Sequence, residues 1–115
     1  MARVAIPVTL ITRSTSGITP PAQTSADTAN DHVIEGNDGR VVIEVQNVGA
    51  DDAVVTVLTP GDVADLAIAD LAVTVPAGTT RWSGKFPTTV FNQPGTDSIH
   101  IDVADADLRF RAYRI

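Results

Sequence analysis

The amino-acid sequence predicts an all-β fold: a single antiparallel β-sandwich or barrel of about eight short strands, with a long polar loop near the N-terminus. Valine, isoleucine and threonine make up 38 of the 115 residues, and these β-branched side chains favour strands over helices. Apolar and polar residues alternate with a period of two in several short segments. Turn sequences separate these segments, which is typical of antiparallel sandwiches and barrels.

Length and composition place the whole chain, residues 1–115, in one domain. A domain of this size buries roughly two-thirds of its unfolded surface, so it can hold a core although it has no cysteine for disulfides. The net charge of -6 disfavours a nucleic-acid partner, which requires a basic surface. No apolar run reaches the ~20 residues of a membrane helix. Pro7 interrupts the run that a signal peptide would need, so we expect folding in a cytoplasm and no membrane.

The first predicted strand covers residues 3–12. Pro7 lacks an amide donor, so this strand should lie at a sheet edge or carry a bulge. Residues 14–31 then form an 18-residue polar loop, and loops this long are uncommon in small domains unless they are functional or disordered. A short strand at 32–34 follows. Residues 36–39 (GNDG) form a turn, because Gly and Asn tolerate positive φ.

The middle of the chain is expected to form a hairpin. Residues 40–48 alternate, and residues 53–59 are the expected antiparallel partner across a turn at 47–52. Ala, Leu and Asp over 62–67 favour a short helical turn with Asp62 as N-cap.

Strands at 70–75 and 80–86 come next. In the second of these, Trp82 and Phe86 share one face. Because aromatic side chains contribute strongly to core packing, we expect both in the core. An exposed Trp82 would instead suggest a platform on which sugar rings stack.

The C-terminal part is expected to contain a short strand at 90–92 and two longer strands at 98–103 and 108–114. In the first of the longer strands Ile99, Ile101 and Val103 point inward. In the last strand Leu108, Phe110 and Ala112 point inward, so that Arg109, Arg111 and Tyr113 lie on the opposite face.

The sequence contains no pattern that is typical of an enzyme. It has two histidines, His32 and His100, and neither a cysteine nucleophile nor a serine in a Gly-x-Ser-x-Gly elbow. Aspartates cluster near 51–52, 62–70 and 102–107, but without the spacing of a calcium-binding loop, and aspartate is common in turns. We therefore expect no catalytic residue, no metal site and no cofactor.

Two sets of residues are candidates for binding a protein partner. The outward face of the last strand forms a local basic stripe, which either contacts an acidic surface or is a solvated face whose charges discourage edge pairing. The polar loop is the second candidate, because it can become ordered against a neighbour. The predicted partner-binding residues are Arg109, Arg111, Tyr113, Ile18, Pro20 and Pro21.

Several segments between residues 30 and 115 share a pattern with a known class of protein. They are 37–47 (NDGRVVIEVQN), 63–66 (VADL), 73–81 (VTVPAGTTR), 84–87 (GKFP) and 91–92 (FN). Together they resemble small all-β structural proteins encoded among the virion genes of tailed bacteriophages, especially those of actinobacteria.

This resemblance implies a capsid decoration, or cement, protein located on the exterior of the virion and assembled in the host cytoplasm. Such proteins bind the outside of the shell formed by the major capsid protein, in many copies and often as homotrimers. No catalytic motif comes with the resemblance. The alternatives are another virion role, such as a tail or head–tail connector subunit, or a carbohydrate-binding or adhesion module.

Overall fold

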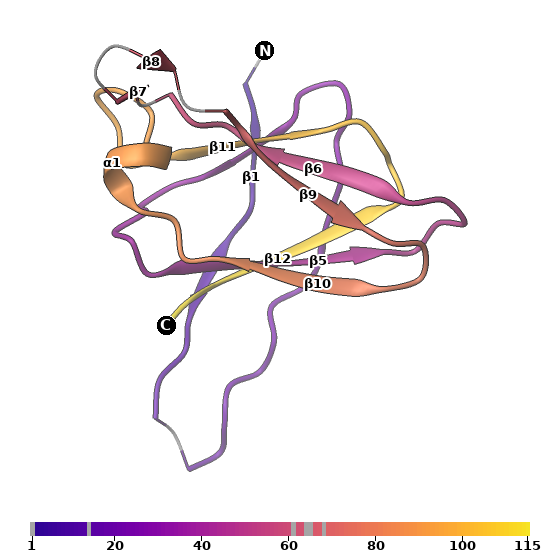
Figure 1. Cartoon of the computed structure of the whole chain (residues 1–115). Coiled ribbons are helices and arrows are strands. Elements are labelled where there is room, and N and C mark those ends of the chain that lie inside the picture. The colour runs from indigo at the N-terminus through magenta and orange to yellow at the C-terminus, as the bar shows by residue number, and fades with distance from the viewer. Residues whose placement is uncertain (1, 14, 61, 64–65, 68) are drawn as a thin grey trace.

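The structure, a computed structural model, describes residues 2–13, 15–60, 62–63, 66–67 and 69–115. The described residues form two sheets packed face to face, as in a β-sandwich, so the predicted all-β class is confirmed (Figure 1). Sheet A contains, in spatial order, β1 (Val4–Ala5), β4 (His32–Ile34), β11 (Ile99–Val103), β6 (Ala53–Val57) and β9 (Leu71–Val75). Sheet B contains β10 (Thr80–Gly84), β5 (Val41–Asn47), β12 (Leu108–Arg114) and β2 (Val8–Leu10), and β3 (Thr24–Ser25) also pairs with β12.

The core lies between the two sheets and is almost entirely aliphatic. Each large side chain buried here stabilises the fold by about 1.5–3 kcal/mol, which accounts for a stable interior without disulfides. Alternation predicted the inward residues of β11 and β12 correctly. The completely buried core residues of the strands are Ile34, Val41, Ile43, Val45, Val55, Val57, Val75, Ile99, Ile101, Leu108, Phe110 and Ala112.

The N-terminal strand is divided between the two sheets. β1 pairs in parallel with β4 at the edge of sheet A, and β2 pairs in parallel with β12 at the edge of sheet B. Ile6 lies between them in the core, 2% exposed, and Pro7 follows where the chain crosses over. The predicted edge position is therefore confirmed, but the prediction of one continuous strand is wrong. These two parallel pairs also make the sheets mixed rather than purely antiparallel.

The predicted hairpin between 40–48 and 53–59 does not form. β5 pairs with β10 and β12 in sheet B, whereas β6 pairs with β9 and β11 in sheet A. The intervening turn carries the chain from one sheet to the other. Alternation gives the same pattern for a hairpin and for such a connection, because it reports which face is buried and not which strand is the neighbour.

Two short segments also differ from expectation. The helical turn predicted over 62–67 is wrong where it is described: β7 (Asp62–Val63) and β8 (Leu66–Ala67) pair as antiparallel strands, and residues 64–65 lie outside the described residues. The strand predicted at 90–92 is instead part of a single helical turn, α1 (Thr88–Phe91), which begins after Pro87. Proline is favoured at helix starts because its φ is already helical.

Candidate partner-binding face

Between β2 and β3 the chain leaves the sandwich and projects beyond sheet B (Figure 1). We call residues 11–23, of which all but Ser14 are described, the arm. The predicted loop extends to residue 31, whereas the arm ends at residue 23. From Thr24 onward the chain pairs with β12 through β3, and residues 27–31 pack against the domain.

The outer face of sheet B carries the predicted basic stripe. Arg111 lies opposite Glu44 on β5, and its Nη1 is 3.0 Å from Glu44 Oε2. The same guanidinium donates from Nε to the carbonyl of Pro21 on the arm, at 2.8 Å. Both partners belong to this chain, so Arg111 joins the arm to the sheet instead of standing free for an external acid.

Further polar contacts lie beside Arg111 on the same face. Gln23 Nε2 donates to Gln46 Oε1 at 2.6 Å, directly beside Arg109 in the strand register. Arg109 donates from Nη1 to the carbonyls of Ala106 and Leu108, both at 2.9 Å, and so supports the turn before β12. The C-terminal limb of the arm therefore leaves the sheet in a direction that several polar contacts fix.

Trp82 is exposed on this outer face, and its prediction as a core residue is wrong. Its side chain is 55% exposed and stacks on Tyr113, with ring centroids 5.1 Å apart and ring planes 13° apart. Tyr113 beneath it is only 6% exposed. β10 ends at Gly84, whose φ of 139° interrupts the alternation, so Phe86 turns into the core while Trp82 stays outside.

The structure brings some of the predicted contact residues together. Arg109, Arg111 and Tyr113 share one face as predicted, and Pro21 joins them through its carbonyl. Ile18 and Pro20 lie farther out on the arm, where Ile18 is half-buried and Pro20 is exposed. Sequence reasoning missed Trp82 as a member of this face. Gly84 was the available signal, because a glycine two residues after Trp82 marks a place where strand alternation can fail.

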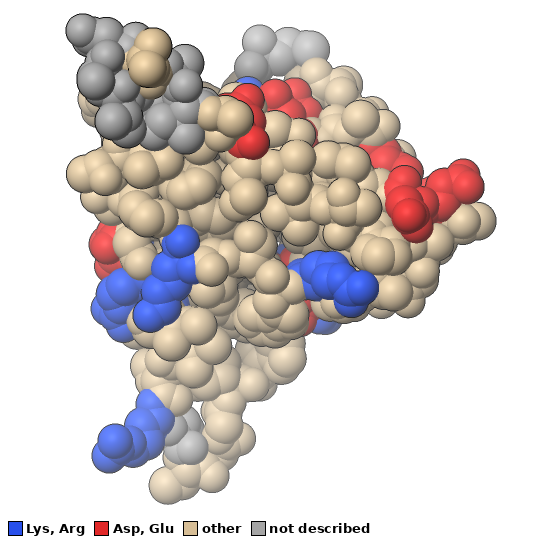
Figure 2. Space-filling model, in the orientation of Figure 1, with Lys and Arg blue, Asp and Glu red and all other residues tan. Residues whose placement is uncertain are grey.

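Charge is distributed unevenly over the molecule. Of the eight Lys and Arg residues, all except Arg3 belong to the arm or to sheet B and the residues that flank its strands. In the view of Figure 2, Lys and Arg lie mainly in the lower half of the molecule, and Asp and Glu lie mainly in the upper half and at the right-hand end. The connections β5–β6 and β11–β12 contribute Asp51, Asp52, Asp105 and Asp107 to that end.

A depression of about 440 Å³ lies on the opposite side of the sandwich, beside β4 and β11. Its lining residues are Ala2, Arg3, Val33, Glu35, Ser98 and His100. Burial lowers the pKa of His100, and Arg3 acts in the same direction. In the described part of the chain, no three His, Asp or Glu side chains gather as a metal site.

Comparisons with protein-family models, with curated proteins and with solved structures give no match to this chain. Among the described residues, no helix is long and apolar enough to cross a membrane. The most distinctive surface of the chain is the outer face of sheet B together with the arm, which we call the docking face.

Proposed function

We propose that this protein is a capsid decoration protein of a tailed bacteriophage, which binds the outer surface of the major capsid protein shell as a homotrimer and stabilises it. The observation that best supports a binding role is the exposed Trp82, stacked on Tyr113 next to Arg111. Tryptophan is among the residues that most often dominate interface energies, and here Tyr113 supports its ring from below. The resemblance to phage virion proteins supplies the identity of the partner.

The arm supports this proposal by its position and by its attachment. It projects beyond the face that carries Trp82, so both can contact one surface (Figure 1). Arg111 and Gln46 hold its C-terminal limb before any partner is bound. Such preorganisation reduces the entropy lost on binding. Weak contacts repeated over many copies on a symmetric shell then add up through avidity.

The direct test is co-sedimentation of the purified protein with shells that lack it. We expect saturable binding, reduced about tenfold or more by Trp82→Ala, as for a central aromatic anchor. Val54→Ala is the matched control, because Val54 is 45% exposed but lies on β6 in sheet A. Absence of wild-type binding to mature shells would contradict the proposal. Gel densitometry of particles separates decoration, with many copies, from a connector or tail role, with few.

A carbohydrate-binding role is the second candidate, and the same tryptophan favours it. A flat indole backed by Tyr113 and flanked by the Glu44–Arg111 ion pair offers a stacking surface beside hydrogen-bonding groups. Trp82 is the sole tryptophan, so its fluorescence reports directly on this site. A saturable shift with soluble oligosaccharides, without shell binding, would replace the decoration proposal. Shell binding with an unmoved spectrum across a sugar panel would exclude the carbohydrate role.

A further inference from the structure

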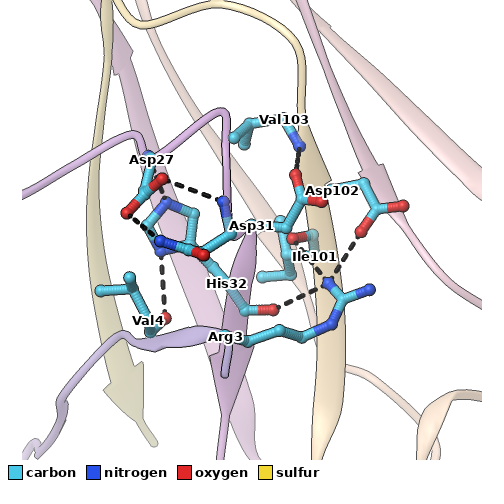
Figure 3. A network of polar contacts seen from close by, with 9 residues as sticks. Arg3, Val4, Asp27, Asp31, His32, Ile101, Asp102 and Val103 are labelled. Carbon is cyan, nitrogen blue, oxygen red and sulfur yellow. Dashed lines mark hydrogen bonds and ion pairs between the residues drawn. The ribbon is translucent and has the colours of Figure 1, made fainter. Parts of the chain in front are cut away.

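A buried histidine contacts the turn that follows β3, over residues 27–31. His32, drawn with its polar contacts in Figure 3, is the first residue of β4 and is 0% exposed. The centroid of its ring lies 5.1 Å from that of Phe110 on β12. Sequence reasoning placed this residue beside the polar loop without assigning it a role. A fully buried imidazole is unusual unless both of its nitrogens have partners.

Both ring nitrogens of His32 are used, and together they define one protonation state. Nε2 lies 2.9 Å from the backbone nitrogen of Asp27 and accepts its hydrogen, so Nε2 carries no proton. Nδ1 lies 3.1 Å from the carbonyl oxygen of Val4, which can only accept, so Nδ1 carries the proton. The fold therefore selects the neutral imidazole with its hydrogen on Nδ1.

These two bonds join separate parts of the chain. Val4 belongs to β1, whereas Asp27 begins the turn that follows β3 and the arm. Asp27 organises this turn, because its carboxylate accepts hydrogen bonds from the backbone of Ala29 and from the backbone and side chain of Asn30. We call the set of Val4, Asp27 and His32 the latch.

Residues next to the latch tie it to sheet A. The carbonyl of Asp31 accepts from the backbone nitrogen of Val4 at 2.9 Å, and its carboxylate accepts from that of Val103 at 2.9 Å. Arg3 donates to the His32 carbonyl at 3.2 Å and forms an ion pair of 2.7 Å with Asp102 (Figure 3). The latch thus joins the turn over residues 27–31 to β1 and β4 at the edge of sheet A.

The charged groups around the ring act in opposite directions. Burial lowers the pKa of His32, and the positive charge of Arg3 adds to this effect. The carboxylates of Asp27 and Asp31 and the bond to the Val4 carbonyl favour the protonated ring. Phe110 contributes only an apolar ring from β12. Burial outweighs the carboxylates, so the neutral ring is favoured at neutral pH.

We propose that His32 is a proton-sensitive latch, and that its protonation releases Asp27 and thereby loosens the turn over residues 27–31. A proton on Nε2 would face the Asp27 amide hydrogen, so two donors would oppose each other beside a buried charge.

The direction of the pH effect follows from the linkage between proton binding and folding. The folded state binds the proton more weakly than the unfolded state, in which imidazole has a pKa of about 6.5. The latch is therefore intact above about pH 6.5 and opens as the pH falls toward the lowered pKa of His32. One proton is involved, so opening increases by up to about tenfold per pH unit within that window.

Amide hydrogen exchange on the free protein tests the latch directly. We expect the opening equilibrium of the Asp27 amide, corrected for intrinsic exchange, to rise by up to about tenfold per pH unit below about pH 6.5. The amide of Val45 in β5 is the internal control and should keep its protection. If NMR shows that His32 becomes protonated while the Asp27 amide stays fully protected from exchange, the proposal is wrong.

A non-titrating variant adds a second test. His32→Gln can accept from one atom and donate from another without gaining charge, so the pH dependence at Asp27 should disappear. His100→Gln is the matched control and should retain it, because His100 is not part of the latch. If His32→Gln does not fold, the wild-type exchange profile still decides. Exchange needs no shell, so failure of shell binding at every pH contradicts only the proposed function.

Discussion

At the scale of single residues, the buried Asn47 organises the connection between β5 and β6. Asn47 is 1% exposed and donates from Nδ2 to the carbonyls of Asp51 and Val75, at 2.7 and 3.0 Å. Its Oδ1 accepts from the backbone nitrogen of Gly49 at 2.9 Å. These bonds shape the β5–β6 turn and attach it to β9, which is why the chain crosses between sheets here.

Asn47→Ala should therefore destabilise the fold by about 2–3 kcal/mol, because it leaves the buried Val75 carbonyl without its donor. Chemical denaturation followed by circular dichroism measures this change. Thr89→Ala, at an exposed position of α1, is the control and should stay within about 0.5 kcal/mol of the wild type. Equal stability of the two variants would show that the Asn47 bonds are not needed.

Which single residues the sequence predicts depends on whether the strand pattern continues through them. In β11 and β12 the alternation is unbroken, so Ile101 and Phe110 were placed correctly in the core. Around Trp82 the pattern stops at Gly84, and the indole was assigned to the wrong face. The burial of His32 depends on contacts with segments remote from β4, which periodicity does not report.

At the scale of elements, polar side chains determine how the arm leaves the domain. Arg111 has side-chain exposure of 29% and pairs with Glu44, which has 14%, so this ion pair is partly shielded from solvent. Arg111 also donates a hydrogen bond to the Pro21 carbonyl, which attaches the arm to β12. The arrangement assigns the predicted stripe a role in orienting the arm.

Arg111→Glu should weaken shell binding by about tenfold while the domain stays folded. The substitution places a carboxylate beside Glu44 and removes the donor to Pro21, so the arm loses its orientation. Arg81→Glu changes net charge by the same amount at an exposed position of β10 and should weaken binding clearly less, because it does not release the arm. Equal losses in both variants would show that net charge, and not arm orientation, controls docking.

The sequence predicts the positions of the strands better than their pairing, for a physical reason. Strand positions follow from local alternation, and most were found, whereas strand partners depend on contacts between distant segments. The division of the first strand at Pro7 was only partly anticipated, because proline signals an edge but not a change of sheet. The sequence predicts a polar loop over residues 14–31, but β3 within that range is only two residues long and lacks any periodic signal.

At the scale of the whole molecule, positive and negative side chains lie mainly in different regions of the protein. The arm and sheet B hold nearly all Lys and Arg, although the chain carries a net charge of -6. Composition indicates an acidic protein, and the sequence pattern predicts one local basic stripe, on the last strand. The fold instead gathers the few cations on one side, so that the docking face meets a partner with a different local charge from the rest of the molecule.

This asymmetry predicts that shell binding weakens as salt is added. Exposed cations of the arm and sheet B, such as Arg13 and Arg81, interact with a partner's charges through solvent. The screening length there falls from about 10 Å at 0.1 M salt to about 3 Å at 1 M. Co-sedimentation over this range should show steadily falling affinity. Because stacking of Trp82 is apolar, the ratio of wild-type to Trp82→Ala affinity should stay constant across the series. Binding that is independent of salt would contradict an electrostatic contribution and leave the aromatic stack and the arm as the source of affinity.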